Sequence, residues 1–303
     1  MMVTRVKMFA ATLLCGLFTV LGLSGIAGAD GGVKYVHANG LRIAYTEYGQ
    51  GQPLVLLHGG GLTSAMWAEQ IPVLAEKFRV LVPDTRGHGK TDNPEHAFSY
   101  ELLAKDVMAF CRALGVEKPV LMGYSDGGIV ALTVGVRQPD FARALVVGGA
   151  VPPFGEEDRM HYFKGMHSFY APVKDVSNLT DTHLDAMYAA SPEGWELMAR
   201  MHAKPGQPDY WRTLMKDVWG TWNMPESYAY TPAQLGVVKI PVLVILGDRD
   251  DFFLPASAAR LAGLLPAGEL AVVPGAAHNV FRAKSELFNA LVMDFLSRTI
   301  AGN

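Results

Sequence analysis

Short apolar runs recur along the chain at intervals that suit an alternation of strands and helices. The runs cover residues 54–57, 80–82, 120–122, 144–147, 242–246 and 270–273. Continuous runs of this kind are typical of strands that are buried on both faces. Longer segments with a helical spacing of apolar residues, such as 100–114 and 129–137, separate most of them. This order predicts an α/β fold with a mostly parallel central sheet and helices on both faces.

The residues ahead of this alternation predict an antiparallel pair at the start of the sheet. Two strand-like segments, 33–37 and 41–48, are separated by Ala38-Asn39-Gly40. Asn-Gly is a strong signal for a hairpin turn, because both residues tolerate the positive φ that such a turn requires.

Residues 152–236 have a different pattern, in which Met, Tyr, Trp and His are frequent and no strand is evident. Prolines near both ends, at 152–153 and 232, suit hinges because proline fixes the backbone and stops helices. We therefore expect a helical cap that divides the core into residues 30–151 and 237–303. The aromatic residues of this cap either pack its own small core or line a groove, and the pattern leaves both open.

The N-terminus predicts a compartment. Arg5 and Lys7 precede a long apolar run that ends in the small residues Ala-Gly-Ala at 27–29. These features are typical of a secretory signal peptide over residues 1–29, cleaved before Asp30. The alternative is a retained membrane anchor. Cleavage would give a periplasmic or secreted protein with no stable membrane association.

Composition narrows the class of partner. A net charge of −3 with both signs scattered argues against a nucleic-acid partner, which would require a basic stripe. Half of the residues are hydrophobic, as expected of a globular enzyme. No cluster with metal-ligand spacing and no dinucleotide fingerprint is evident, so we expect no metal and no organic cofactor.

The strongest chemical signal is the sequence G-Y-S-D-G-G at residues 123–128. It follows the apolar run at 120–122 and precedes a helical segment, which is the context that the G-x-S-x-G motif requires. In this motif a nucleophile, here Ser125, lies on a strained turn between strand and helix, and the glycines on either side prevent clashes.

The partners of Ser125 are expected later in the chain, in the order acid and then histidine. His278 is the only histidine beyond residue 246, and it follows the last apolar run. We therefore predict that it is the general base. The loop at 247–251 offers the acid, and Asp250 is the predicted one because it is the fourth residue of a Gly-x-x-Asp turn. Asp251 is the close alternative, and the acidic residues at 156–158 are a more distant one.

An oxyanion formed during attack by Ser125 requires hydrogen-bond donors. The sequence L-L-H-G-G-G at 56–61 ends an earlier strand. We expect the backbone N–H of Gly60 to be one donor and the N–H of Asp126 to be the other. His58 is expected to support this loop without a catalytic role.

These motifs together resemble the α/β-hydrolase superfamily. The resemblance rests on L-H-G-G at 57–60, D-T-R-G-H-G at 84–89, the motif at 123–128, the turn at 247–250 and His278. Within the superfamily the chain resembles the group of capped esterases, lactonases, haloperoxidases and C–C hydrolases, whose cap is inserted after the sixth strand. The Ser-Asp-Gly-Gly sequence is shared with biphenyl-hydrolase-like members.

The expected activity is hydrolysis of a carboxylic ester or related acyl bond of a small molecule, through an acyl-enzyme on Ser125. C–C bond hydrolysis, lactone hydrolysis and cofactor-free perhydrolysis or haloperoxidation are alternatives on the same triad. A ligand sensor that keeps the fold without turnover is an alternative from another class.

The side chain of Asp126 allows two interpretations. Its carboxylate either faces the pocket and favours a cationic or hydrogen-bond-donating substrate, or turns away to pair locally. The sequence leaves both open.

Overall fold

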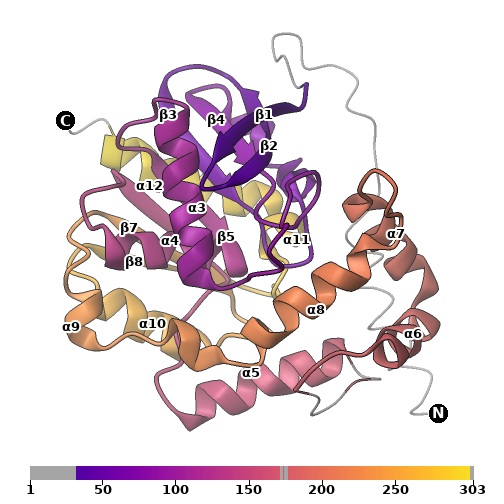
Figure 1. Cartoon of the computed structure of the whole chain (residues 1–303). Helices are drawn as coiled ribbons and strands as arrows, with labels where there is room; N and C mark the ends of the chain where they lie inside the picture. Colours follow the sequence, from indigo (N-terminus) through magenta and orange to yellow (C-terminus); the bar gives the residue numbers. More distant parts are fainter. Residues whose placement is uncertain (1–31, 171–172, 174–176, 301–303) are drawn as a thin grey trace.

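The computed structural model describes residues 32–170, 173 and 177–300 (Figure 1). The predicted signal peptide at residues 1–29 lies outside the described residues and stays a prediction. Among the helices of the described part, none has the length and apolar character needed to cross a membrane.

An eight-stranded sheet forms the centre of the fold, in the order β1-β2-β4-β3-β5-β6-β7-β8. The first two strand pairings, β1 with β2 and β2 with β4, are antiparallel, and the others are parallel. The strands are β1 (Lys34–Ala38), β2 (Leu41–Tyr48), β3 (Gln52–Leu57), β4 (Phe78–Pro83), β5 (Val120–Tyr124), β6 (Ala144–Gly148), β7 (Val242–Gly247) and β8 (Gly268–Val273). The predicted mostly parallel α/β sheet is confirmed.

The apolar runs correspond to the strands at the centre of the sheet. Every residue of β5, β6 and β7 is buried, whereas the edge strand β1 alternates between exposed and partly buried positions. The predicted hairpin joins β1 to β2, and its turn residues Asn39 and Gly40 have φ values of 49° and 76°. Asn and Gly are the residues that adopt this left-handed region most readily.

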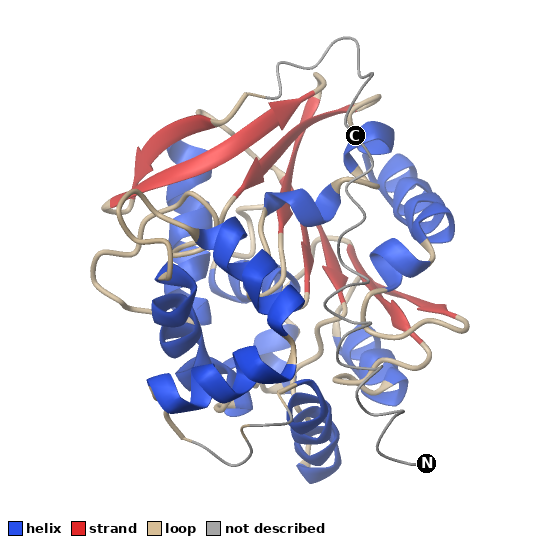
Figure 2. Cartoon of the chain, turned by 90° about the vertical axis from the view of Figure 1, so that its right-hand side faces the viewer, coloured by secondary structure: helices blue, strands red, loops and turns tan. Residues whose placement is uncertain are grey.

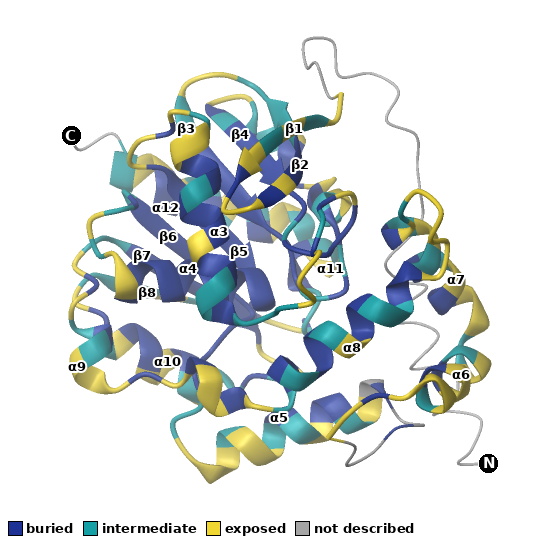
Figure 3. Ribbon diagram, in the orientation of Figure 1, coloured by how far each residue is buried: buried dark blue, intermediate teal, exposed yellow. Residues whose placement is uncertain are grey.

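Helices cover both faces of the sheet, as predicted (Figure 2). Alternate residues of β3 belong to two separate core clusters, since Val55 and Leu57 pack on one side and Leu54 and Leu56 on the other. The core helices are α2 (Ile71–Leu74), α3 (Tyr100–Ala113), α4 (Asp126–Arg137), α10 (Pro255–Leu264), α11 (Val280–Ala283) and α12 (Ser285–Ile300), with a short 3₁₀ helix η1 (Ser64–Trp67). Nearly all residues of α4 and every residue of β5, β6 and β7 are buried, and the central strands are dark in Figure 3.

The chain between β6 and β7 is helical and lies apart from the sheet, along the lower and right-hand sides of Figure 1. Its elements are α5 (Glu156–Phe169), α6 (Asp181–Ala190), α7 (Pro192–His202), α8 (Tyr210–Trp222), η2 (Pro225–Tyr228) and α9 (Pro232–Leu235). We call residues 152–236 the cap. Its aromatic residues serve both of the roles left open by the sequence. Trp195 and Trp211 pack on each other with ring centroids 5.1 Å apart, whereas Tyr162 and Trp222 line a pocket next to the sheet.

Candidate active site

Ser125 occupies a strained turn between β5 and α4. Its backbone angles are φ 54° and ψ −123°, a combination that non-glycine residues rarely adopt. Two glycines make the turn possible. A Cβ on Gly123 would lie 2.0 Å from the carbonyl oxygen of Gly127, and a Cβ on Gly127 would lie 2.1 Å from that of Leu57. Any larger residue at either position would push the turn apart.

The structure brings the side chains of Ser125, His278 and Asp250 together. His278 Nε2 lies 3.1 Å from Ser125 Oγ, and His278 Nδ1 lies 2.9 Å from Asp250 Oδ2 and 3.1 Å from Oδ1. The three residues follow β5, β8 and β7 respectively, so the parallel sheet delivers them to the same edge. This arrangement lets the carboxylate hold Nδ1–H while Nε2 accepts the serine proton.

The two neighbouring aspartates of the acid loop have different environments. Asp250 is buried, and its Oδ1 also accepts hydrogen bonds from the N–H groups of Phe252 (2.9 Å) and Phe253 (3.0 Å). Asp251 is exposed. In the more distant alternative at 156–158, Asp158 accepts a hydrogen bond from the N–H of Phe154 instead. Of the predicted acids, the one that meets His278 is therefore Asp250.

Electrostatics around His278 favour its protonated form. Burial lowers the pKa of His278, but the charge and hydrogen bond of Asp250, together with the charges of Asp251 and Asp126, raise it by more, so that it lies above its ordinary value. A raised pKa makes the imidazole a stronger acceptor for the proton of Ser125. It also means that the imidazole is already protonated, and therefore unable to act as a base, at a higher pH.

The residues of the two predicted oxyanion donors, Gly60 and Asp126, line the same pocket as Ser125. Gly59 O accepts hydrogen bonds from His58 Nδ1–H (2.8 Å) and Leu62 N–H (3.2 Å). The N–H of Gly60 belongs to the same trans peptide and therefore points to the opposite side. Asp126 is the first residue of α4, where an N–H has no acceptor within the helix.

The Asp126 carboxylate lies in the pocket wall and is paired with residues far away in the sequence. Its Oδ1 accepts a hydrogen bond from Tyr100 Oη (2.9 Å), and its Oδ2 accepts one from Trp222 Nε1 in the cap (2.8 Å). Burial raises the pKa of Asp126, and the two hydrogen bonds only partly offset this. The side chain thus combines the two interpretations, because it faces the pocket and is also paired, although not locally.

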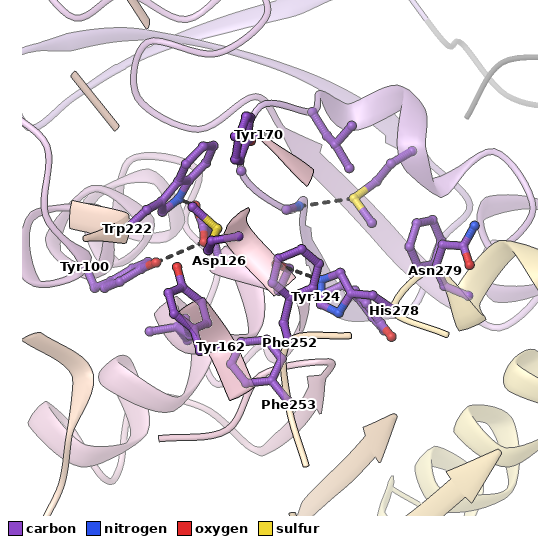
Figure 4. Close-up of a pocket in the computed structure, with 18 residues that line it drawn as sticks. Tyr100, Tyr124, Asp126, Tyr162, Tyr170, Trp222, Phe252, Phe253, His278 and Asn279 are labelled. Carbon is purple, nitrogen blue, oxygen red and sulfur yellow. Dashed lines mark hydrogen bonds between the residues drawn. The ribbon is translucent and has the colours of Figure 1, made fainter. Parts of the chain in front are cut away.

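The pocket beside Ser125 is mostly apolar. Its walls are Gly59, Gly60, Leu62, Met66, Tyr100, Tyr124, Ser125, Asp126, Ile129, Tyr162, Met166, Tyr170, Trp222, Phe252, Phe253, His278, Asn279 and Phe281 (Figure 4). These described lining residues include no lysine or arginine. A bound substrate therefore meets mostly apolar side chains and the carboxylate of Asp126, without a lysine or arginine among these residues to balance a negative charge.

Three buried histidines lie next to this site, and the sequence analysis expected a supporting role for only one of them, His58. The rings of His58 and His88 lie 5.0 Å apart, and those of His88 and His202 lie 5.6 Å apart. Burial lowers the pKa of all three, that of His202 to about 4. His88 lies in the motif at 84–89, which gave a signal, but His202 lies in the cap, where no pattern distinguishes it.

These histidines make the fold sensitive to acid. The folded-state pKa of His202 is about 4 and its ordinary value is 6.5, so the unfolded chain takes up the proton first as the pH falls. We expect this residue alone to remove about 3 kcal/mol from the free energy of unfolding between pH 6.5 and pH 4. His58 and His88 act in the same direction. His278, with its raised pKa, acts in the opposite direction and only above pH 6.5.

Urea unfolding of the parent and of a His202→Gln variant, at half-unit pH steps, isolates this contribution. The difference in unfolding free energy between the two proteins is expected to shrink as the pH falls. A difference that is constant from pH 7 to pH 4 would show that His202 does not titrate in this way.

Comparisons with known proteins agree with this geometry. A family model described as alpha/beta hydrolase fold matches residues 52–283. The serine hydrolase BPHL of Mus musculus is 28% identical over 86% of this chain and 85% of its own length. The 2-hydroxy-6-oxo-6-(2'-aminophenyl)hexa-2,4-dienoic acid hydrolase of Metapseudomonas resinovorans is 27% identical over 88% of this chain and 91% of its own. Among solved structures, the meta-cleavage product hydrolase CumD of Pseudomonas fluorescens IP01 superposes with a TM-score of 0.70 at 24% identity, over 88% of this chain and 97% of its own.

Proposed function

This chain belongs to the α/β-hydrolase fold family, and from that premise we propose that it is a serine hydrolase that cleaves a carboxylic ester of a small molecule. The observation that carries the proposal is the chain of contacts from Ser125 Oγ through His278 to the buried carboxylate of Asp250. A nucleophile, a base and an orienting acid in hydrogen-bond reach of one another are the parts that acyl transfer requires.

The reaction proceeds in two halves. His278 Nε2 takes the proton of Ser125 as Oγ attacks the ester carbonyl, and the oxyanion accepts hydrogen bonds from the N–H groups of Gly60 and Asp126. The protonated His278 then gives its proton to the leaving alcohol, which leaves an acyl-enzyme. A water molecule then gives a proton to His278 as it attacks the acyl carbon. His278 passes this proton to Ser125 Oγ when the bond between Oγ and the acyl carbon breaks, which releases the acid and restores the serine.

The charge distribution in the pocket favours a substrate with an uncharged acyl group. The walls offer aromatic rings and the carboxylate of Asp126, and no lysine or arginine lies among the described lining residues. The Metapseudomonas relative is named for a dienoic acid, a substrate class with a negative charge. An anion in the present pocket would meet Asp126 without a compensating lysine or arginine among the described lining residues, so we favour neutral esters over C–C hydrolysis of such acids. Lactones are cyclic esters and require the same groups.

p-Nitrophenyl esters test this proposal directly. We expect residues 30–303 to hydrolyse the neutral esters from acetate to octanoate, and to hydrolyse the singly anionic p-nitrophenyl hemisuccinate with a kcat/KM lower by about tenfold or more. The physical reason is repulsion from the carboxylate of Asp126 in a mostly apolar pocket. The measurement is kcat/KM at pH 7.5 for each ester.

Asp126→Asn provides the matched variant. Its amide can still accept from Trp222 Nε1 and can donate to Tyr100 Oη, so it removes the charge and keeps the contacts. We expect the preference for neutral esters to shrink in this variant. Absence of turnover with any ester would contradict the esterase proposal, and an unchanged preference would contradict the role of the charge.

A further inference from the structure

The loop that carries Gly60 is held by three different histidines, one for each successive peptide group. Gly59 O accepts from His58 Nδ1–H at 2.8 Å. The N–H of Gly61 donates to His88 Nε2 at 3.0 Å, and the carbonyl oxygen of Gly61 accepts from His202 Nε2–H at 3.1 Å. The peptides on both sides of Gly60, and the one that follows, therefore each have a fixed partner.

The partners determine the tautomer of His202. A backbone N–H only donates, so Nδ1 must be the acceptor of the Gly89 N–H, 2.8 Å away. A carbonyl only accepts, so Nε2 must carry the proton that it donates to Gly61. The ring is neutral and fully buried, and both of its nitrogens are used.

The segment around Gly89, which contacts Nδ1 of the His202 ring, is itself linked to the sheet. Lys204, two residues later, donates from Nζ to the carbonyl oxygens of Gly89 and Thr91, each at 2.7 Å. The Thr91 hydroxyl in turn accepts from a backbone N–H of β2 at 2.9 Å. The segment around Gly89 is thus fixed. The imidazole of His202 connects this segment to the loop that carries Gly60, because it accepts from the Gly89 N–H and donates to the Gly61 carbonyl.

His202 lies in a different part of the fold from the other two histidines. His58 and His88 belong to the core, whereas His202 is the last residue of α7 in the cap. A second cap residue approaches at the same point, since a Cβ built on Gly61 would lie 3.3 Å from Met198 Cε. The third peptide of the oxyanion loop is therefore held from the cap.

We propose that His202 is a positioning residue through which the cap fixes the oxyanion hole. Without its Nε2–H, the Gly61 carbonyl would be buried without this donor, and the peptide would rotate toward another one. Glycines at 60 and 61 offer little resistance to such a rotation, and Gly61 already has a φ of 68°. The rotation is passed on through the intervening Gly60–Gly61 peptide and moves the Gly60 N–H away from the oxyanion. The inference rests on the proposed serine hydrolase function.

Two substitutions separate the two hydrogen bonds of the ring. In His202→Asn, Oδ1 takes the place of Nδ1 and keeps the Gly89 contact, but the donor to Gly61 is lost. In His202→Gln, the amide nitrogen takes the place of Nε2 and keeps that donor, while the Gly89 contact is lost. A residue with a merely structural role would be affected by both changes to a similar extent.

We expect kcat for p-nitrophenyl butyrate to fall by about tenfold or more in His202→Asn, because loss of a whole oxyanion donor costs about 100-fold to 1,000-fold. KM is expected to stay within about twofold, since the ground state does not use the hole. His202→Gln is expected to keep kcat within about threefold. His183→Asn, the same substitution in α6 of the cap, is the matched control and is expected to leave kcat unchanged.

A trifluoromethyl ketone inhibitor supplies a second readout. Ser125 Oγ adds to the ketone carbon, the serine proton passes to His278, and the carbonyl electron pair becomes an oxyanion in the hole. Its affinity is expected to weaken in His202→Asn in proportion to kcat and to remain near the parent value in His202→Gln. Equal losses in both variants, a loss confined to KM, or full kcat in a folded His202→Asn protein would each overturn the proposal. If His202→Asn does not fold, a tenfold loss of kcat in His202→Gln overturns it.

The parent enzyme distinguishes failure of this inference from failure of the proposed function. If the parent hydrolyses esters, the function stands whatever the variants do. If it hydrolyses none, hydrogen exchange of residues 58–62 still tests the inference, with an increase of about tenfold or more expected in His202→Asn and none in His202→Gln. Equal exchange in the parent and both variants would overturn it.

Discussion

Replacing Ser125 with alanine is expected to lower kcat for a neutral p-nitrophenyl ester by a factor of about 10⁴ to 10⁶, to the level supported by binding and the oxyanion donors alone. The variant removes the atom that forms the covalent bond and leaves the rest of the site in place. The Ser125 side chain makes no capping hydrogen bond to α4, so the fold should not depend on it. Steady-state hydrolysis with the purified variant is the measurement.

The control for this result is an exposed serine in the cap, Ser227 of η2. Ser227→Ala is expected to retain the parent rate, and both variants should unfold at the parent temperature. Substantial turnover by a folded Ser125→Ala protein would mean that another group is the nucleophile, and the proposed acyl-enzyme would have to be abandoned.

The second large effect is expected for Asp250→Asn, with a loss of about 10⁴-fold in kcat. The amide nitrogen of Asn would donate toward His278 Nδ1, so the ring would place its proton on Nε2, where it cannot accept the serine proton. Oδ1 would remain available to the N–H groups of Phe252 and Phe253, so the loop should keep its shape. The measurement is kcat with the same ester at pH 7.5.

Asp251→Asn is the matched control, one residue away on the same loop. We expect it to stay within about threefold of the parent, because Asp251 is exposed and Asp250 makes the contact with His278. The opposite ranking of the two variants would make Asp251 the catalytic acid.

The pH profile gives an independent check of the roles of His278 and Asp250. The parent loses kcat/KM as His278 protonates below its raised pKa, above 6.5, and loss of the Asp250 charge should move this acid limb to lower pH.

Much of the fold followed from patterns that act over short distances. The apolar runs at 120–122, 144–147 and 242–246 became the three fully buried strands, because only a strand in the centre of a sheet buries every side chain. The boundaries moved slightly, since α4 begins at Asp126 and not near residue 129. The strand-to-helix turn around Ser125 was equally local, because its strain can be accommodated only between glycines.

The approximate location of the candidate site also followed from the sequence. Parallel strands end at the same edge of a sheet, so a serine, an aspartate and a histidine that each follow a strand are delivered to one place. The sequence could not choose between Asp250 and Asp251 by this argument, because both lie on the same loop. The choice depended on which carboxylate the loop turned inward, and the amides of Phe252 and Phe253 hold Asp250 in that position.

The sequence by itself determined the layers of this protein, the turn that bears Ser125 and the edge of the sheet where the site lies. Tertiary structure alone decided that Trp222 of the cap pairs with Asp126 and that His202 of the cap reaches the carbonyl of Gly61. These contacts join residues 96 and 141 positions apart. The physical reason is that burial and backbone strain leave a periodic or local record in the sequence, whereas a hydrogen bond between distant segments depends on how all the intervening elements pack.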